Sequence, residues 1–353
     1  MKVEKKTVFE MEKCYSIAPL FYRGKHHMLV AAEKTDDCIM MDMQGNYEET
    51  VWKGPSGTMS MVQVPDTDGW FLATREFYSP NDSKKARIIL CRPAPEGGWK
   101  TSVIKFLPHV HRFGILSSGK KHYLIAATLC SGRDYKDDWS YPGKVYACEL
   151  PEDLTVCSED NQLEMKVLKE GLLKNHGYYQ GSVNGSACAV IAAEQGIFQF
   201  LPPGEGQGEW RIRQLTDLPA SDMTFADLDG DGSDEMVTIE PFHGDTVCIY
   251  REAANTYKKV YTYSEKAEFA HAIWAGMVCG RPSALIGHRK GSRKLLMFSW
   301  RSGVQGEFKA DVLDTDAGAA NVLCYEYGGS TYILAANRET DEIVLYKAEE
   351  GDA

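Results

Sequence analysis

A short segment, residues 227–235 (DLDGDGSDE), places oxygen ligands at alternate positions along the chain. Its five ligands would be, in order, Asp227, Asp229, Asp231, the carbonyl of Ser233, and Glu235. Alternate spacing wraps oxygens around one hard cation, and the intervening glycines permit the tight backbone. An EF-hand would need a glutamate at position 12 and flanking helices, whereas Thr238 stands there between strand-like flanks. The segment therefore predicts a structural calcium site.

Histidines offer a second kind of chemistry. Four of the nine histidines lie at the beginnings of strand-like segments, or two residues before one: His109, His111, His176 and His271. Imidazole titrates near neutral pH and can act as a general base, and three imidazoles can hold Zn²⁺ or Mn²⁺ with open coordination positions. The signatures of serine hydrolases, P-loop enzymes, HExxH metalloproteases and dinucleotide-binding enzymes are absent from the sequence.

One pattern of about 18 residues recurs along the chain and indicates which elements must position these side chains. It consists of an apolar strand, a tight turn of Gly, Asp or Ser, and a second strand that ends in small residues and a polar one. The copies are Tyr15–Glu33, Met59–Glu76, His111–Thr128, His176–Glu194, Met223–Glu240, His271–His288 and Ala320–Asn337. Further strand-like runs follow, such as 247–251 with 258–263, which gives four strands per unit.

Seven such units can bury their faces only against their neighbours, so they predict a closed ring. We therefore expect an all-β fold: a single seven-bladed β-propeller over residues 1–353, with four-stranded blades starting near residues 15, 59, 111, 176, 223, 271 and 320. The last unit lacks an outer strand, and residues 6–11 at the N-terminus are predicted to supply it. The long third unit predicts an insertion at 131–165, made of loops at 131–143 and 151–162.

The propeller topology assigns sides to these residues. The first strand of a blade lines the channel and the second returns, so first-strand starts and second-strand ends share one mouth. This places the histidines at that mouth, with Arg75, Arg112, Tyr178, Tyr179, His243 and Asn321 close by in sequence. The second-strand ends add Glu33, Glu76, Thr128, Glu194, Glu240, His288 and Asn337, and the loop after Thr128 adds Trp139. The Asp loop, a turn between first and second strands, falls on the opposite face.

Bulk composition excludes several classes of protein. The net charge of −11 makes a nucleic-acid backbone a poor partner. The basic N-terminal stretch is followed by no apolar region of a signal peptide, and no stretch is apolar enough to span a membrane. The ten cysteines stand mostly alone in apolar segments and form no CxxC pair, which indicates free thiols in a reducing cytoplasm. We expect a cytoplasmic protein, with oligomerisation left open.

The Asp loop at 227–235 resembles the FG-GAP/VCBS repeat of other propellers, and only this unit matches the repeat well. With the blade rhythm and the channel histidines, the chain also resembles the propellers of aldos-2-ulose dehydratase and of seven-bladed polysaccharide lyases such as rhamnose–glucuronate lyase and ulvan lyase. The resemblance implies cleavage of a C–O bond by elimination on a sugar, next to a carbonyl or carboxylate. The cupin domains of the dehydratase are absent, and most such lyases are exported. A small keto-sugar or uronate-containing substrate is therefore expected.

That chemistry assigns roles to the residues. His111 or His176 would be the base, Tyr178 or Tyr179 the acid or base, and Arg75 or Arg112 the partner of a substrate carboxylate. Alternatively His109, His111, His176 and His271 would hold a catalytic Zn²⁺ or Mn²⁺. Substrate-binding candidates are Glu76, Glu194, Glu240, His288, Asn337 and Trp139. The alternative function is a non-catalytic, calcium-stabilised propeller that binds a carbohydrate or a protein.

Overall fold

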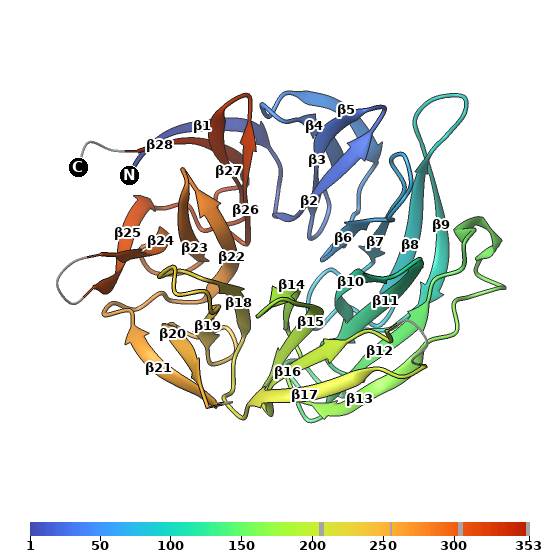
Figure 1. The fold of residues 1–353 in the computed structure, drawn as a ribbon. Helices are drawn as coiled ribbons and strands as arrows, with labels where there is room; N and C mark the ends of the chain where they lie inside the picture. Colours follow the sequence, from blue (N-terminus) through green and yellow to red (C-terminus); the bar gives the residue numbers. More distant parts are fainter. Residues whose placement is uncertain (205–207, 255, 303–305, 351–353) are drawn as a thin grey trace.

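The computed structural model describes residues 1–204, 208–254, 256–302 and 306–350, and these form seven four-stranded antiparallel sheets in a ring (Figure 1). The predicted all-β, seven-bladed propeller is thereby confirmed. Blades 1 to 3 consist of β2 (Cys14–Tyr22), β3 (Lys25–Ala32), β4 (Cys38–Asp42) and β5 (Tyr47–Trp52); β6 (Met61–Gln63), β7 (Phe71–Arg75), β8 (Arg87–Pro93) and β9 (Trp99–Phe106); and β10 (Val110–Ser118), β11 (Lys121–Thr128), β12 (Gly143–Glu149) and β13 (Lys166–Leu172).

Blades 4 to 6 follow in the same order from the channel outward. They consist of β14 (Gly177–Val183), β15 (Ser186–Ala193), β16 (Gly196–Leu201) and β17 (Arg211–Thr216); β18 (Asp222–Ala226), β19 (Glu235–Glu240), β20 (Thr246–Ala253) and β21 (Thr256–Thr262); and β22 (Ala270–Val278), β23 (Arg281–His288), β24 (Leu295–Arg301) and β25 (Glu307–Asp314). One short 3₁₀ helix, η1 (Leu154–Val156), is the only helix in the described part of the chain.

Blade 7 closes the ring with strands from both ends of the chain. Its order is β26 (Asn321–Tyr327), β27 (Ser330–Asn337), β28 (Glu342–Glu349) and β1 (Lys2–Glu10). β1 pairs antiparallel with β28 from Lys2 opposite Glu349 to Glu10 opposite Glu342, so the termini lie side by side (Figure 1). The N-terminal strand is therefore the outer strand of the last blade, as the sequence predicts, and it begins four residues earlier than the expected 6–11.

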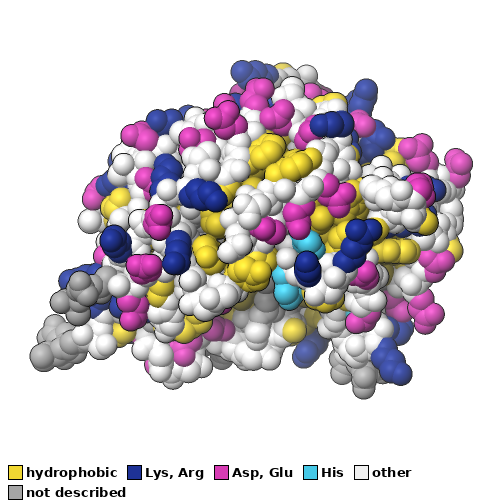
Figure 2. All heavy atoms as spheres, turned by 90° about the horizontal axis from the view of Figure 1, so that it is seen from above, with side chains coloured by type: hydrophobic (Ala, Val, Ile, Leu, Met, Phe, Trp, Pro, Cys, Tyr) yellow, Lys and Arg dark blue, Asp and Glu magenta, His cyan; other side chains and the backbone are white. Residues whose placement is uncertain are grey.

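The hydrophobic core is divided among the interfaces between neighbouring blades. One cluster joins Val237 and Ile249 of blade 5 to Ile286 and Phe298 of blade 6, all fully buried. The second strands are buried along most of their length, whereas outer strands such as β17 are largely exposed. Burying a side chain of this kind contributes about 1.5–3 kcal/mol, so each blade depends on its neighbours for most of its stability. Acidic and basic side chains are interspersed over the surface in Figure 2.

The long third unit has its extra residues in two loops, close to the expected 131–143 and 151–162. It contains β12 (Gly143–Glu149), a regular strand of blade 3, between two separate loops. The first loop is tied to blade 2, because the Asp137 amide donates to Asn81 Oδ1 at 2.9 Å and Asn81 Nδ2 donates to Asp137 Oδ1 at 3.0 Å. This connection holds residues 131–142 beside the mouth of the channel.

Candidate functional site

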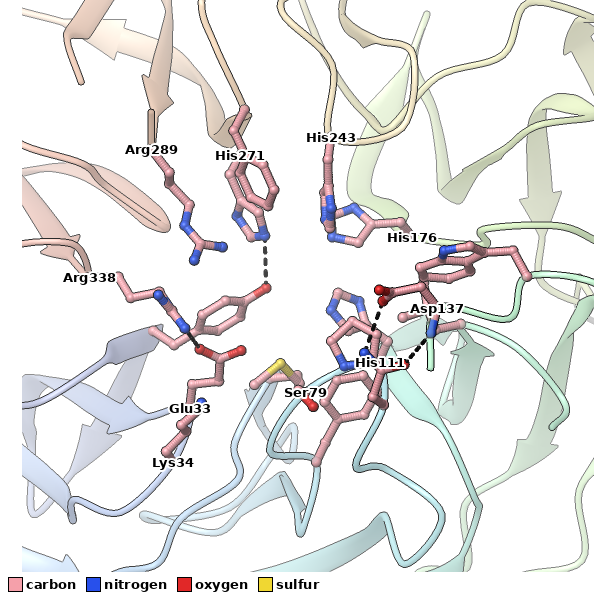
Figure 3. Close-up of a pocket in the computed structure, with 18 residues that line it drawn as sticks. Glu33, Lys34, Ser79, His111, Asp137, His176, His243, His271, Arg289 and Arg338 are labelled. Carbon is pink, nitrogen blue, oxygen red and sulfur yellow. Dashed lines mark hydrogen bonds and ion pairs between the residues drawn. The ribbon is translucent and has the colours of Figure 1, made fainter. Parts of the chain in front are cut away.

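A pocket of about 290 Å³ opens at the mouth of the channel, where the inner strands begin (Figure 3). Every blade contributes to its lining. The principal side chains are Tyr15 and Glu33 of blade 1, Met59 of blade 2, His111 and Trp139 of blade 3, His176 of blade 4, His243 of blade 5, His271 and Arg289 of blade 6, and Arg338 of blade 7.

Tyr15, His111 and His271 occupy the same position in their blades. In each case the pairing of the inner strand with the second strand skips this residue, with register shifts between residues 14 and 16, 110 and 112, and 270 and 272. Each of the three is therefore the extra residue of a β-bulge. A bulge redirects a side chain that would otherwise follow the two-residue alternation of the strand. Three bulges at equivalent places thus present a phenol and two imidazoles to the channel.

The next blade fixes the orientation of two of the imidazole rings. His176 Nδ1 lies 3.0 Å from the Ser221 carbonyl, and His271 Nδ1 lies 2.8 Å from the Ala320 carbonyl. A carbonyl only accepts, so Nδ1 carries the proton in both rings and Nε2 is left as the electron-pair donor. Gly177 allows blades 4 and 5 to approach closely enough for the contact between His176 and Ser221. A Cβ at residue 177 would stand only 2.8 Å from the Ser221 carbonyl oxygen.

The imidazoles of His176, His243 and His271 converge. One ring nitrogen from each lies within 4.8 Å of the others, and His176 Nε2 is buried without a hydrogen-bond partner among the described residues. Ligand nitrogens of a tetrahedral zinc ion stand about 3.3 Å apart, so a modest side-chain movement would bring the set to ligand distance. Carbonyls at Nδ1 are the usual outer partners of metal-binding histidines. The donor set, its orientation and the unpartnered nitrogen therefore fit a divalent transition metal.

These imidazoles are neutral near pH 7. Burial, followed by the charge of Arg112, lowers the pKa of His176 to about 3. Burial, with the nearby Arg289, also holds the pKa of His271 well below its ordinary value. Burial lowers the pKa of His111 and of His243 in the same direction, and His176 is the next contributor in both. Neutral rings are the form that either metal ligation or general-base catalysis requires.

Four of the predicted site residues line the pocket: His111, His176, His271 and Trp139. The His111 ring lies 4.6 Å from that of His176, centroid to centroid, and its Nδ1 is buried without a partner among the described residues. Trp139 packs against Phe242 and lies under the Arg133 guanidinium. His109, the remaining predicted ligand, lies outside the lining, and its Nδ1 is 2.8 Å from Ser83 Oγ.

The other predicted catalytic residues lie outside the lining and bond elsewhere. Tyr178 donates to Gln180 Oε1, Tyr179 to the Ser182 carbonyl, Arg75 to the carbonyls of Pro55 and Ser56, and Arg112 to the Met59 carbonyl. The two tyrosines pack into the interfaces on either side of blade 4. β14 carries no bulge, so its alternating side chains point toward the flanking blades.

The predicted substrate-binding residues at second-strand ends also have partners within their own blades. Glu76 pairs with Arg87, Glu194 with Lys174, and Glu240 with Thr238 and Tyr250; His288 contacts Lys290 and Lys294, and Asn337 donates to Tyr346. In blades 6 and 7 the lining residue is the next one along, Arg289 or Arg338. A shift of one residue reverses the side to which a strand residue points, so the sequence pattern missed both arginines.

The sequence gives only weak indications that His243, Tyr15 and Glu33 belong to the pocket. His243 follows Phe242, whose ring stacks on it at 3.9 Å, in the loop after β19. Tyr15 was expected at the mouth without a chemical role, and its hydroxyl lies 3.0 Å from His271 Nε2. Because that nitrogen is the acceptor, the phenol donates. Glu33 was expected at the mouth and does line the pocket.

The Asp loop lies at the opposite end of β18 from the residues that contact His176. Carboxylate oxygens of Asp227, Asp229 and Glu235 lie within 4.8 Å of one another. The chain itself provides a cation there: the Arg251 guanidinium pairs with Asp229 and, at 2.9 Å, with Glu235. Backbone amides donate to Asp227, to Asp231 and to the other oxygens of Asp229 and Glu235. Asp229 and Glu235 are thus shared with Arg251, while the three carboxylates lie close enough to hold one cation, and the calcium site stays a prediction.

A buried carboxyl group, Asp222, begins β18 next to Ser221. Its Oδ1 accepts from the amides of Tyr178 and Met223 at 3.1 and 3.0 Å. Burial raises its pKa to about 7, although the Arg112 charge and the two amides act in the opposite direction. The Asp222 carboxyl group at the start of β18 therefore holds its proton to a higher pH than an ordinary aspartate does.

Fold and site together define a seven-bladed propeller with a histidine-lined pocket at one mouth of its channel. Solved structures with a similar fold include a streptogramin B lyase, with 11% identity and a TM-score of 0.57 over 98% of each chain. They also include the PQQ domain of pyranose dehydrogenase from Coprinopsis cinerea, with 10% identity and a TM-score of 0.51, covering 98% of this chain and 95% of that one. A third is the Cps50 (Swd1) propeller domain from Myceliophteria thermophila, with 8% identity and a TM-score of 0.58, covering 98% of this chain and 100% of that one.

At these identities the likeness extends to the fold alone. No family model and no curated protein matches the chain, so the FG-GAP/VCBS assignment stays a prediction. No helix in the described part of the chain has the length and apolar character needed to cross a membrane.

We expect Arg251→Met to lower the melting temperature, because it removes the cation between Asp229 and Glu235 and its stacking on Trp300. Each kcal/mol lost lowers the Tm by about 1–2 °C in a protein of 353 residues, because the unfolding entropy is about 2.1 cal/mol/K per residue. The variant, unlike the wild type, should regain stability with millimolar calcium relative to a chelator. Arg213→Met, which breaks a more exposed pair with Glu252, is the control. A calcium-dependent Tm in the wild type would contradict this expectation.

Asp222→Asn should change how stability depends on pH. The folded pKa of about 7 lies above the ordinary value of 3.8, so the folded state holds this proton more tightly than the unfolded chain. Its contribution is complete below pH 3.8 and is lost as the pH rises through 7, at roughly 1 kcal/mol per pH unit. The amide keeps an acceptor oxygen but does not titrate. Urea unfolding between pH 4.5 and 7.5 checks this, and parallel curves for the two proteins would refute it.

Proposed function

We propose that this protein is a metal-dependent carbon–oxygen lyase acting on a small keto-sugar or sugar acid in the pocket at the channel mouth. The observation that carries the proposal is the convergence of neutral imidazoles from His176, His243 and His271, two of them oriented by carbonyls of the next blade. Zn²⁺ or Mn²⁺ suits such a nitrogen donor set. This ligand set replaces the sequence-based one by exchanging His109 and His111 for His243.

The metal, when bound, would act as a Lewis acid on an oxygen of the substrate. Proton removal belongs to the protein, and we assign it to His111, because its ring is buried next to that of His176 and its Nδ1 has no partner among the described residues. In the proposed elimination the base takes a proton from the carbon next to a carbonyl. A carbon–carbon double bond forms as the C–O bond one carbon further along breaks.

The departing oxygen needs a proton, and the Tyr15 hydroxyl is a suitable donor. It is buried, and burial raises its pKa, so it is a neutral phenol in the resting pocket. Its hydroxyl donates to His271 Nε2 in the metal-free pocket, and a metal on that nitrogen would release the hydroxyl toward the substrate. Tyr15 and His111 come from blades 1 and 3 and line the same pocket. A base and an acid on separate elements allow one substrate to contact both.

Elemental analysis tests the metal centre independently of any substrate. Wild-type protein should carry zinc or manganese near one equivalent, and His176→Gln, His243→Gln and His271→Gln should lose it. His26→Gln, an exposed histidine outside the pocket, is the matched control and should retain it. Full metal content in all three variants would refute the centre.

The elimination is tested by the ultraviolet absorbance of the unsaturated product across keto-sugars and uronides. His111→Gln should lower kcat by about 10²–10⁴-fold while retaining the metal, since loss of a general base has this size of effect. Tyr15→Phe should act in the same direction. If the wild type is inactive on the whole panel, the protein is better described as a binding propeller.

A further inference from the structure

One side of the pocket is lined by Glu33, Arg338 and Arg289, with Arg289 next to His271 (Figure 3). Glu339, outside the lining, links the two arginines, so that acidic and basic side chains alternate. Arg338 pairs with Glu33 and, at 2.8 Å, with Glu339. Glu339 Oε1 in turn accepts from Arg289 Nε and Nη2 at 2.8 and 2.7 Å. Only 12% of the Arg289 side chain and 11% of the Arg338 side chain is exposed. Burial and these ion pairs together hold both guanidinium planes in fixed positions.

Arg289 has a nitrogen that remains available to donate to a ligand. Its Nε and Nη2 are taken by Glu339, whereas its Nη1 makes no hydrogen bond within the described residues. The Phe269 ring, 4.8 Å away, fixes the plane from one side. Figure 3 shows the guanidinium pointing into the pocket beside His271, and its charge contributes to lowering the pKa of that histidine. A fixed guanidinium with a free edge loses little entropy when it binds an anion.

The lining concentrates cationic side chains in a chain whose net charge is −11. It contains Lys34, Arg289 and Arg338 against Glu33 and Asp137, and Glu339, which pairs with both arginines, lies outside the lining. Glu33 and Glu339 together offset the charges of the two arginines, and Asp137 is bonded to Asn81. What this side of the pocket offers an anion is therefore the unpaired edge of Arg289 in a partly enclosed site.

We propose that this side of the pocket is an anion subsite: Arg289 binds the carboxylate or phosphate of a monosaccharide whose reacting end faces His176 and His243. The inference rests on the proposed use of the pocket as the substrate site. It narrows the substrate from sugars in general to sugar acids or sugar phosphates. A pocket of about 290 Å³ matches a molecule of that size.

Equilibrium binding tests the subsite without requiring turnover. Calorimetry would compare glucuronate, glucose 6-phosphate and glucose on metal-loaded wild type. At least one of the anionic sugars should bind about tenfold or more tightly than glucose, the size expected for one hydrogen bond to a charged group. The stronger of the two distinguishes carboxylate from phosphate. Equal affinity for all three, or no binding of any, would overturn the proposal.

Substitutions assign the effect to the residue. Arg289→Gln should abolish the preference for the anionic sugar and leave glucose affinity unchanged, and Arg289→Lys should restore part of it. Arg87→Gln is the matched control, because Arg87 also pairs with a glutamate, Glu76, and stacks on a phenylalanine, Phe106, at 4.8 Å, outside the pocket lining. Unchanged anion affinity in Arg289→Gln would refute the subsite. Turnover of neutral sugars by the wild type, with no anion preference, would refute it while leaving the lyase proposal intact.

Discussion

The extra residue at the start of an inner strand is the constraint on which the pocket depends. Regular strands of a propeller blade point their side chains alternately toward the two neighbouring blades, and those positions are occupied by the core. The pairing of the inner strand with the second strand skips residues 15, 111 and 271. The side chain of each skipped residue therefore does not follow the two-residue alternation of the strand. Blades 1, 3 and 6 can therefore direct polar groups into the channel without giving up apolar contacts between blades.

Contacts between blades then turn these side chains into a defined site. The carbonyls of Ser221 and Ala320, each just before the inner strand of the next blade, fix Nδ1 of His176 and His271. Burial keeps the rings uncharged. Across the pocket, arginines and glutamates neutralise one another in a ladder that leaves one guanidinium edge free. One side of the pocket thus offers the electron pairs of imidazole nitrogens, and the other offers the hydrogen-bond donors of a guanidinium group.

The two ends of the inner strand of blade 5 are specialised differently. Its first residues contact His176 and carry the buried Asp222, whereas the Asp loop at its far end is held by Arg251 and by backbone amides. Arg251 also stacks on Trp300 and Phe308, so the loop connects blade 5 to blade 6. The most conspicuous acidic motif of the chain therefore contributes to blade packing, away from the pocket.

The sequence by itself determined the seven repeats, the four strands in each and closure of the ring by the N-terminal strand, because strand periodicity and turn residues act locally. The mouth position of His111, His176 and His271 followed from the same repeat. Only the tertiary structure decided that His243 and Arg289 join them and that Tyr178 and Tyr179 do not. A bulge or a one-residue shift at a strand end reverses the direction of a side chain, and neither leaves a local mark in the sequence. Whether a charged residue is free to bind a ligand depends on partners from other blades, as Arg289 and Arg338 show.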